Sequence, residues 1–134
     1  FVISPDREQL LLILHGKLGI WVQPGGHIDP EDVDLRSAAL RELIEETGLA
    51  EVRPSPLAPG LLDVDIHRIP ANPRKSEPAH EHLDLRFLFE ASTESIEAAS
   101  DALDARWLDL DDLGGLATDE SVRRAVRKLR SALL

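Results

Sequence analysis

Cysteine is absent from the 134 residues of this chain. This absence excludes disulfides, thiol nucleophiles and zinc or iron–sulfur centres held by cysteine. Long apolar stretches are also missing, because no run approaches the roughly 20 residues of a membrane-spanning helix. No basic-then-apolar signal segment opens the sequence, so we expect a cytoplasmic protein with no membrane partner. The sequence begins at Phe1 rather than at methionine, which leaves open a targeting segment lost from its front.

Basic residues are scarce relative to acidic ones, with 15 Lys and Arg against 25 Asp and Glu and a net charge of −10. Long duplex nucleic acid binds through many Lys and Arg contacts to phosphate, so we expect no such partner. A small phosphorylated substrate stays compatible with this charge, because a bound metal ion can invert the local field. Length and the absence of repeats predict a single domain over residues 1–134.

The most informative segment is residues 25–49, which read GGHIDPEDVDLRSAALRELIEETGL. The pattern predicts a helix over about 35–47. Either Asp32 or Asp34 is suited to cap its start, and Gly48 is suited to a left-handed cap at its end. The two glycines at the front of the segment let the backbone pass close to a ligand, because no side chain stands in the way.

Three glutamates share one face of this predicted helix. At about 100° of rotation per residue they span an arc of about 100°. They are Glu42, Glu45 and Glu46, and the opposite side carries Leu40, Leu43 and Ile44, which we expect to pack inward. Like charges at this spacing repel each other near the negative end of the helix dipole. They therefore indicate an oxygen-ligand site for Mg²⁺ or Mn²⁺, the alternative being a solvated acidic surface.

These residues resemble the Nudix box, G-x5-E-x7-R-E-U-x-E-E-x-G-U with U apolar. The matching positions are Gly26, Arg41, Glu42, Leu43, Glu45, Glu46, Gly48 and Leu49. Counting back from Arg41, the position of the first glutamate is taken by Val33, and the nearest acid is Asp32. The loop is thus one residue longer and its acid shorter. We interpret this as a change in loop geometry, because in the family the first glutamate mainly supports the loop and the arginine.

The resemblance implies an α/β fold, the Nudix-type α/β/α sandwich with a mixed β-sheet. It also implies a metal-dependent hydrolase that cleaves a diphosphate linkage in a nucleoside diphosphate-linked small molecule or nucleotide. On this interpretation Glu42, Glu45, Glu46 and the backbone carbonyl of Gly25 bind Mg²⁺ or Mn²⁺. Arg41 orients the glutamates, and Glu42 is the candidate general base, so the catalytic residues are Glu42, Glu45 and Arg41. A homodimer is the default expectation for a symmetric assembly.

Three other functions are compatible with parts of the pattern. An isopentenyl diphosphate isomerase shares this fold, but its chemistry depends on cysteine. A non-catalytic Nudix-like module would bind a nucleotide or ADP-ribose and signal; such modules commonly lose box glutamates, whereas this chain keeps all three. A third hypothesis is a protein-interaction module with an acidic surface helix that matches the box by accident.

Apolar periodicity outside the box predicts the remaining elements. The continuous apolar run over 10–15 indicates a strand buried on both faces. Residues 61–69 and 80–89 alternate apolar and polar side chains, which is typical of strands with one wet face, and the polar segment 70–78 connects them. A closing helix is expected to have Thr118 as its N-cap and an apolar stripe of Val122, Val126, Leu129 and Leu133. Five cations are expected on its solvated face, namely Arg123, Arg124, Arg127, Lys128 and Arg130.

Candidate substrate-binding residues lie on these elements. They are Trp21, as an aromatic wall beside the glycine turn, Arg74 and Lys75 in a lid-like loop, and His80, His82 and Arg86 along one strand. With His67 on the preceding strand, the His-x-His pair could also bind zinc, or simply line a polar groove or face water. By the resemblance, an acid ahead of Trp107 can add a metal ligand, and Asp101 and Asp104 are the acids at that place.

Overall fold

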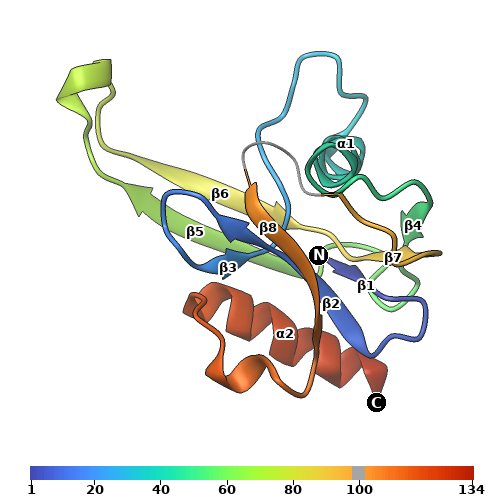
Figure 1. Ribbon diagram of the computed structural model, residues 1–134. Helices are drawn as coiled ribbons and strands as arrows, with labels where there is room; N and C mark the ends of the chain where they lie inside the picture. Colours follow the sequence, from blue (N-terminus) through green and yellow to red (C-terminus); the bar gives the residue numbers. More distant parts are fainter. Residues whose placement is uncertain (98–101) are drawn as a thin grey trace.

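A mixed β-sheet lies between two helices in the computed structural model, which describes residues 1–97 and 102–134 (Figure 1). The strands of this sheet are β1 Val2–Ile3, β2 Gln9–His15, β3 Trp21–Val22, β4 Val52–Pro54, β7 Phe89–Ala91 and β8 Ala102–Asp109. Their order is β3-β2-β1-β7-β4, and β8 also pairs with β2. Strands β1 and β7 run parallel, while the other pairs are antiparallel. The expected α/β/α sandwich with a mixed sheet is confirmed.

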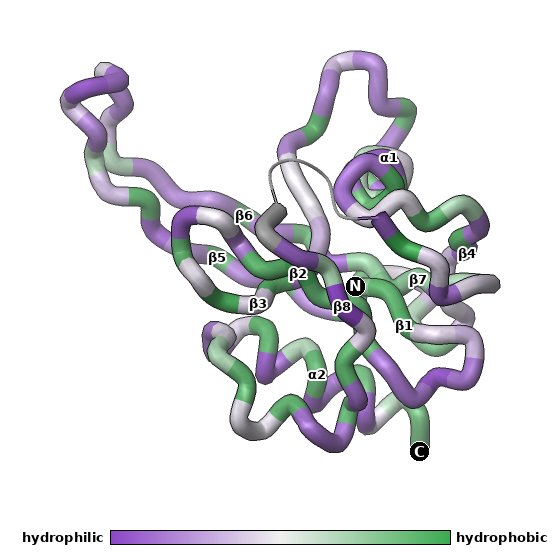
Figure 2. The backbone as a smooth tube through the Cα atoms, in the orientation of Figure 1, coloured by the Kyte–Doolittle hydropathy of each residue, from purple (hydrophilic) through white to green (hydrophobic). Residues whose placement is uncertain are grey.

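Strand β2 is buried on both faces, as the apolar run predicts. Leu10 and Leu12 pack in the core beneath helix α2, which spans Glu120–Leu133. Leu11 and Ile13 point to the other side and pack in the core beneath helix α1, which spans Leu35–Thr47. Because successive strand residues face opposite ways, one strand contributes to both cores. Figure 2 shows the corresponding hydrophobic stretch through the centre of the molecule.

Helix α1 begins and ends at capping residues that the sequence indicates. The Asp34 carboxylate accepts a 2.7 Å hydrogen bond from the backbone N–H of Ser37, so Asp34 rather than Asp32 is the N-cap. Gly48 adopts φ of +67°, and its N–H donates to the carbonyl of Ile44. A left-handed cap of this kind favours glycine, because a Cβ would be strained there.

The buried face of α1 differs from expectation at one residue. Leu43 is buried, but Ile44 is 41% exposed, so its predicted inward packing is wrong. The buried residues of the helix are Ala38, Leu43 and Thr47. These positions rotate the covered face toward the glutamate side and leave Ile44 about 60° beyond its edge.

Strands β5, Asp63–Ile69, and β6, His80–Arg86, form a separate two-stranded hairpin. It extends from the body to a hydrophilic end that contains the short 3-10 turn η1, Pro73–Lys75 (Figures 1 and 2). The two strands pair as expected, and the face that is exposed to water carries apolar side chains. The apolar side chains Val64, Ile66 and Leu83 are 43%, 62% and 60% exposed, whereas Asp63 is buried. The alternating polar side chains instead face the body, where they meet cations and a cavity.

Helix α2 closes the second layer. Its N-cap is Asp119, which accepts from the N–H of Val122, so the prediction of a Thr118 cap is wrong; the Thr118 hydroxyl donates to the Trp21 carbonyl. Val122, Val126 and Leu129 of the predicted apolar stripe are buried. Each of the five cations has a partner. Arg123 donates to carbonyls of the turn η2 (Leu113–Gly115). Arg124 and Lys128 pair with Asp63, Arg127 pairs with Glu120, and Arg130 pairs with Asp111. Within residues 1–97 and 102–134, neither helix is long and apolar enough to cross a membrane.

Candidate active site

Arg41 joins the loop before α1 to the glutamates of the helix. Its Nε and Nη2 donate to the two carboxylate oxygens of Asp32, each at 2.9 Å. Its Nη1 donates to Glu42 Oε1 at 3.1 Å and to Glu45 Oε2 at 3.2 Å, and Nη2 also donates to the His27 carbonyl at 3.0 Å. One planar guanidinium therefore orients two glutamates and holds the loop beside them.

Asp32 supports Arg41, which is the role that the resemblance assigns to the first glutamate of the box. Only 8% of its side chain is exposed, and besides the two hydrogen bonds from Arg41 it accepts a third, from the N–H of Asp29 at 2.7 Å. Hydrogen bonds from Arg41 and from Asp29 hold the pKa of Asp32 below its usual value, while the bond to Asp32 raises the pKa of Arg41. The pair is ionised at neutral pH, so the shorter acid and longer loop still support the arginine.

The two glycines of the turn contact the glutamates in different ways. A Cβ added to Gly26 would stand 2.4–2.5 Å from the carboxyl atoms of Glu42, which is closer than any side chain tolerates. The backbone N–H of Gly25 donates to Glu46 Oε2 at 3.0 Å. A side chain at position 26 would therefore displace the Glu42 carboxylate, which is the end of a flexible side chain.

The donors gathered here fit a hard divalent cation. Glu42 and Glu45 each accept a hydrogen bond from Arg41, Glu46 accepts one from the Gly25 N–H, and the single arginine offsets part of their negative charge. The Glu42 side chain is 18% exposed and that of Glu45 is 58% exposed, so the group is open to solvent. An all-oxygen set of this kind suits Mg²⁺ or Mn²⁺.

A cavity of about 870 Å³ lies between α1 and the polar face of the β5–β6 hairpin. Gly25 and Gly26 line one part of it, so the glutamates adjoin the cavity through the glycine turn. Apolar lining comes from Leu35, Ala38, Ala39, Leu43, Phe87 and Phe89, and polar lining from His27, Asp65, His67, His82, Asp84 and Arg86, among others. The cavity thus combines an apolar wall with a polar, imidazole-rich wall.

The structure brings some of the predicted substrate-binding residues to this cavity and leaves others away from it. His82 and Arg86 line it. Arg86 is already engaged, because its guanidinium donates to the carbonyl and hydroxyl of Ser121 at 3.0 and 2.7 Å and lies 3.5 Å from Asp63. His80 contacts His82 from beside the cavity, with 3.2 Å between their Nε2 atoms.

Trp21, Arg74 and Lys75 lie outside the residues that line the cavity. Trp21 packs against the α2-side core, with the Arg106 guanidinium 5.6 Å from its ring centre. Arg74 and Lys75 belong to η1 at the end of the hairpin. Of the two acids ahead of Trp107, Asp104 accepts from Arg106 at 2.7 Å, and Asp101 lies outside the described residues.

Sequence reasoning missed the acidic residues of the hairpin. Asp65 and Asp84 are directly opposite in the strand register and line the cavity. Along each strand they lie two residues from His67 and His82, which also form a register pair. The signal was the period of two along each strand, which places these acids on the same face as the histidines. The buried Asp63 was missed as well, because its partners come from α2, about 60 residues away.

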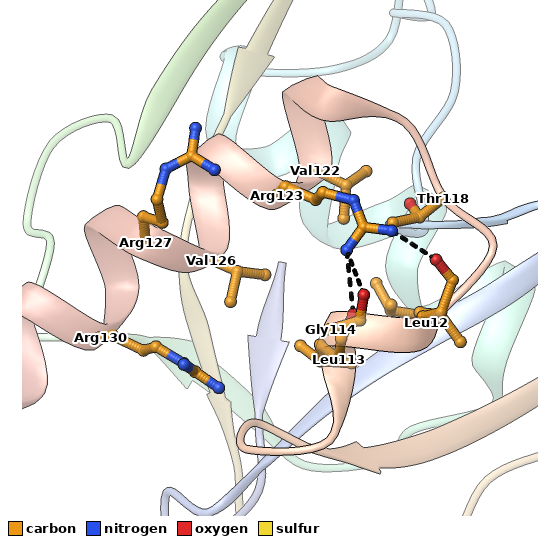
Figure 3. A pocket seen from close by; sticks show the side chains of 10 residues that line it. Leu12, Leu113, Gly114, Thr118, Val122, Arg123, Val126, Arg127 and Arg130 are labelled. Carbon is orange, nitrogen blue, oxygen red and sulfur yellow. Dashed lines mark hydrogen bonds between the residues drawn. The ribbon is translucent and has the colours of Figure 1, made fainter.

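A second cavity, of about 170 Å³, lies between α2 and η2 (Figure 3). Its lining is apolar apart from Gly114, Thr118 and three arginines, Arg123, Arg127 and Arg130. Arg123 reaches across to the carbonyls of Leu113 and Gly114 at 3.1 and 3.2 Å. Carboxylates are absent from this lining among the described residues, so the acidic site lies elsewhere, at the glycine turn.

Comparison with known proteins agrees with the geometry. The NUDIX domain family matches residues 1–129, and the chain belongs to this family. It is 32% identical over 99 residues to a Lactococcus lactis subsp. cremoris protein named "Probable DHNTP pyrophosphohydrolase"; the match covers 74% of this chain and 50% of that protein. The chain therefore spans about half the length of that relative.

Solved structures share the fold at low identity. A C. elegans Ap4A hydrolase in a binary complex is 17% identical, with a TM-score of 0.73 over 98% of this chain and 93% of that chain. The NUDIX domain of Shewanella oneidensis NrtR complexed with ADP ribose is 20% identical, with a TM-score of 0.68 over 99% of this chain and 84% of that chain. At these identities the likeness establishes the fold.

Proposed function

We propose that this protein is a metal-dependent Nudix pyrophosphohydrolase that cleaves a diphosphate linkage in a nucleotide or a nucleoside diphosphate-linked small molecule. The observation that carries this proposal is the hydrogen-bonded group in which Arg41 joins Asp32, Glu42 and Glu45 beside the glycine turn. A group of this kind is costly as a mere surface, because three glutamates share one helix turn with a single arginine. A bound divalent cation would offset the repulsion between these carboxylates and so account for the arrangement.

Glu42, Glu45, Glu46 and the Gly25 carbonyl would hold Mg²⁺ or Mn²⁺. When bound, such ions neutralise phosphate oxygens and make water a stronger nucleophile. Arg41 keeps Glu42 and Glu45 oriented through its two Nη1 contacts. Glu42 is our candidate general base; because its Oε1 accepts from Arg41, its Oε2 is the oxygen that would take a proton from water.

The cavity would hold the rest of the substrate. Its apolar wall, with Ala39, Leu43 and Phe87, suits a flat ring, and His82 and Arg86 on the facing wall suit phosphate oxygens. Trp21, Arg74, Lys75 and His80 would contact only a ligand that extends beyond this cavity. The names of the relatives mention DHNTP, Ap4A and ADP ribose, and these compounds form the first substrate panel.

The alternative function is a sensing module that binds a nucleotide or ADP-ribose without turnover. The presence of ADP ribose in the Shewanella domain supports this alternative, whereas retention of all three box glutamates supports hydrolysis. Turnover separates the two. The homodimer and the cytoplasmic location stay predictions.

The test is release of phosphate or pyrophosphate from the panel, extended to nucleoside triphosphates, nucleotide sugars and NADH, with Mg²⁺ or Mn²⁺. Wild type is compared with Glu45→Gln, and with Glu51→Gln as a control at an exposed acid outside the box. We expect wild type and the Glu51→Gln control to hydrolyse a compound of the panel. Glu45→Gln should lose most of this activity while its melting temperature stays that of wild type. Removal of the metal with a chelator should abolish the wild-type activity, and addition of Mg²⁺ or Mn²⁺ should restore it.

Two results would contradict the proposal. Tight binding of one ligand with no turnover of any compound would favour the sensing module. Equal turnover by wild type and Glu45→Gln would place the chemistry elsewhere and remove the metal assignment.

A further inference from the structure

Four of the five histidines in the chain gather around the hairpin wall of the cavity, apart from the box glutamates. His67, His82 and Asp84 each offer one ligand atom, and these atoms all lie within 4.8 Å of one another. The backbone sets this grouping. His67 and His82 are directly opposite in the strand register, and Asp84 lies two residues further along the same face.

Two contacts in the cluster have the length that shared metal ligation requires. His67 Nδ1 lies 3.2 Å from Asp84 Oδ2, and His80 Nε2 lies 3.2 Å from His82 Nε2. Zinc bonds of about 2.0–2.1 Å in a tetrahedron place neighbouring ligand atoms about 3.3–3.4 Å apart. Side-chain rotations at the partly exposed His67 and Asp84 would bring the ligand atoms of His67, His82 and Asp84, now within 4.8 Å of one another, around one ion.

His80 is also oriented as a ligand. Its Nδ1 lies 3.0 Å from the carbonyl of Pro78. A hydrogen donated there leaves the lone pair on Nε2, the atom that faces His82, and metal-bound histidines typically make this hydrogen bond to a backbone oxygen. Two facing Nε2 lone pairs would repel each other, so either a hydrogen or a cation must lie between the rings.

We propose that His67, His82 and Asp84 bind Zn²⁺ or a similar transition-metal ion, and that the neighbouring His80, which lies outside this group of three, turns toward the ion as a fourth ligand. Imidazoles with one carboxylate suit zinc, whereas the oxygen-only glutamate site suits Mg²⁺. The ion would join β5 to β6, and a two-stranded hairpin is only marginally stable alone in water. This site goes beyond the proposed hydrolase activity; it shares His82 with the wall of the cavity, so zinc and a substrate phosphate would compete for that side chain.

The experiment measures zinc binding to the chelator-treated full chain in the presence of excess Mg²⁺, which competes for the glutamate site. Zn²⁺ is titrated against a chromophoric chelator, and Co²⁺ serves as a probe through its tetrahedral absorption. The variants are His82→Ala, Asp84→Asn, and Glu45→Gln. His15→Ala is the matched control, because the His15 ring accepts from the backbone of Lys17 and Leu18 outside the cluster.

We expect one zinc ion per chain, bound equally by wild type, His15→Ala and Glu45→Gln. His82→Ala is expected to lose more than the roughly 10–100-fold in affinity that removal of a second-shell partner costs. Addition of zinc should also raise the Tm of wild type and leave the Tm of His82→Ala and Asp84→Asn nearly unchanged. Circular dichroism is used to check that each variant folds. Absence of stoichiometric binding by wild type, unchanged affinity in His82→Ala, or loss of binding in Glu45→Gln would each overturn the proposal.

Discussion

The substitution Asp63→Asn is expected to lower the free energy of unfolding by about 2 kcal/mol near neutral pH. The Asp63 side chain is 1% exposed and accepts hydrogen bonds from Arg124 and Lys128 of α2. Burial raises its pKa, but the bonds from the two cations outweigh burial and lower the pKa from 3.8 to about 2. At about 1.4 kcal/mol per pKa unit, this shift corresponds to roughly 2–2.5 kcal/mol of stability.

The pH dependence identifies the carboxylate as the cause. A lowered pKa means that the stabilisation is complete above about pH 4 and disappears as the pH falls through about 2. Unfolding free energies from urea titrations at several pH values should therefore show a gap between wild type and Asp63→Asn that narrows over this window. With an unfolding entropy of about 0.28 kcal/mol/K for 134 residues, the gap near neutral pH lowers Tm by about 7 °C.

Asp111→Asn is the control, because Asp111 is 95% exposed and lies 3.5 Å from Arg130. An exposed pair of this kind is expected to change the unfolding free energy by less than about 0.5 kcal/mol. If Asp63→Asn were no less stable than this control, or if its deficit stayed constant from pH 7 to pH 2, the reasoning from the buried carboxylate would be refuted.

Two glycine substitutions test the close approach of Gly26 to Glu42 and the left-handed cap at Gly48. Gly60→Ala is the common control, because a Cβ added there meets nothing within 4 Å. Gly26→Ala should displace the Glu42 carboxyl and lower kcat/KM by roughly 100-fold with little change in Tm; wild-type kinetics would contradict the packing argument. Gly48→Ala places a side chain at φ of +67° and 3.2 Å from Glu97 Cβ. Gly48→Ala should therefore lower the free energy of unfolding, measured by urea titration, by roughly 1–2 kcal/mol and leave kcat per folded molecule unchanged. A free energy of unfolding equal to that of Gly60→Ala would argue against strain at this cap.

Much of the box could be predicted from the sequence because its determinants are local. Helix α1 has the predicted bounds, Gly48 is its left-handed cap, and the order of strands and helices gives the expected sandwich. Caps, turns and helical faces depend on residues three or four positions apart, so short-range rules decide them. The departure at Asp32 was visible too, although its pairing with Arg41 spans nine residues and needed coordinates.

The wall opposite the box was not predictable in the same way. Alternation along β5 showed that Asp63, Asp65 and His67 share a face, but not that this face turns inward. Its orientation depends on Arg124 and Lys128 of α2, which neutralise Asp63 from about 60 residues away. The same limit applies to Trp21, whose partners are core residues and Arg106.

The sequence by itself determined the box, its capping residues, the strand buried on both faces and the family that these features resemble. Each of these rests on periodicity or on contacts within one turn of the chain. The tertiary structure alone decided which face of the hairpin lines the cavity, which cations are engaged in ion pairs, and that His67, His82 and Asp84 converge. Those outcomes depend on how separate elements pack, because burial of a charged side chain is favourable only where a distant partner arrives to neutralise it.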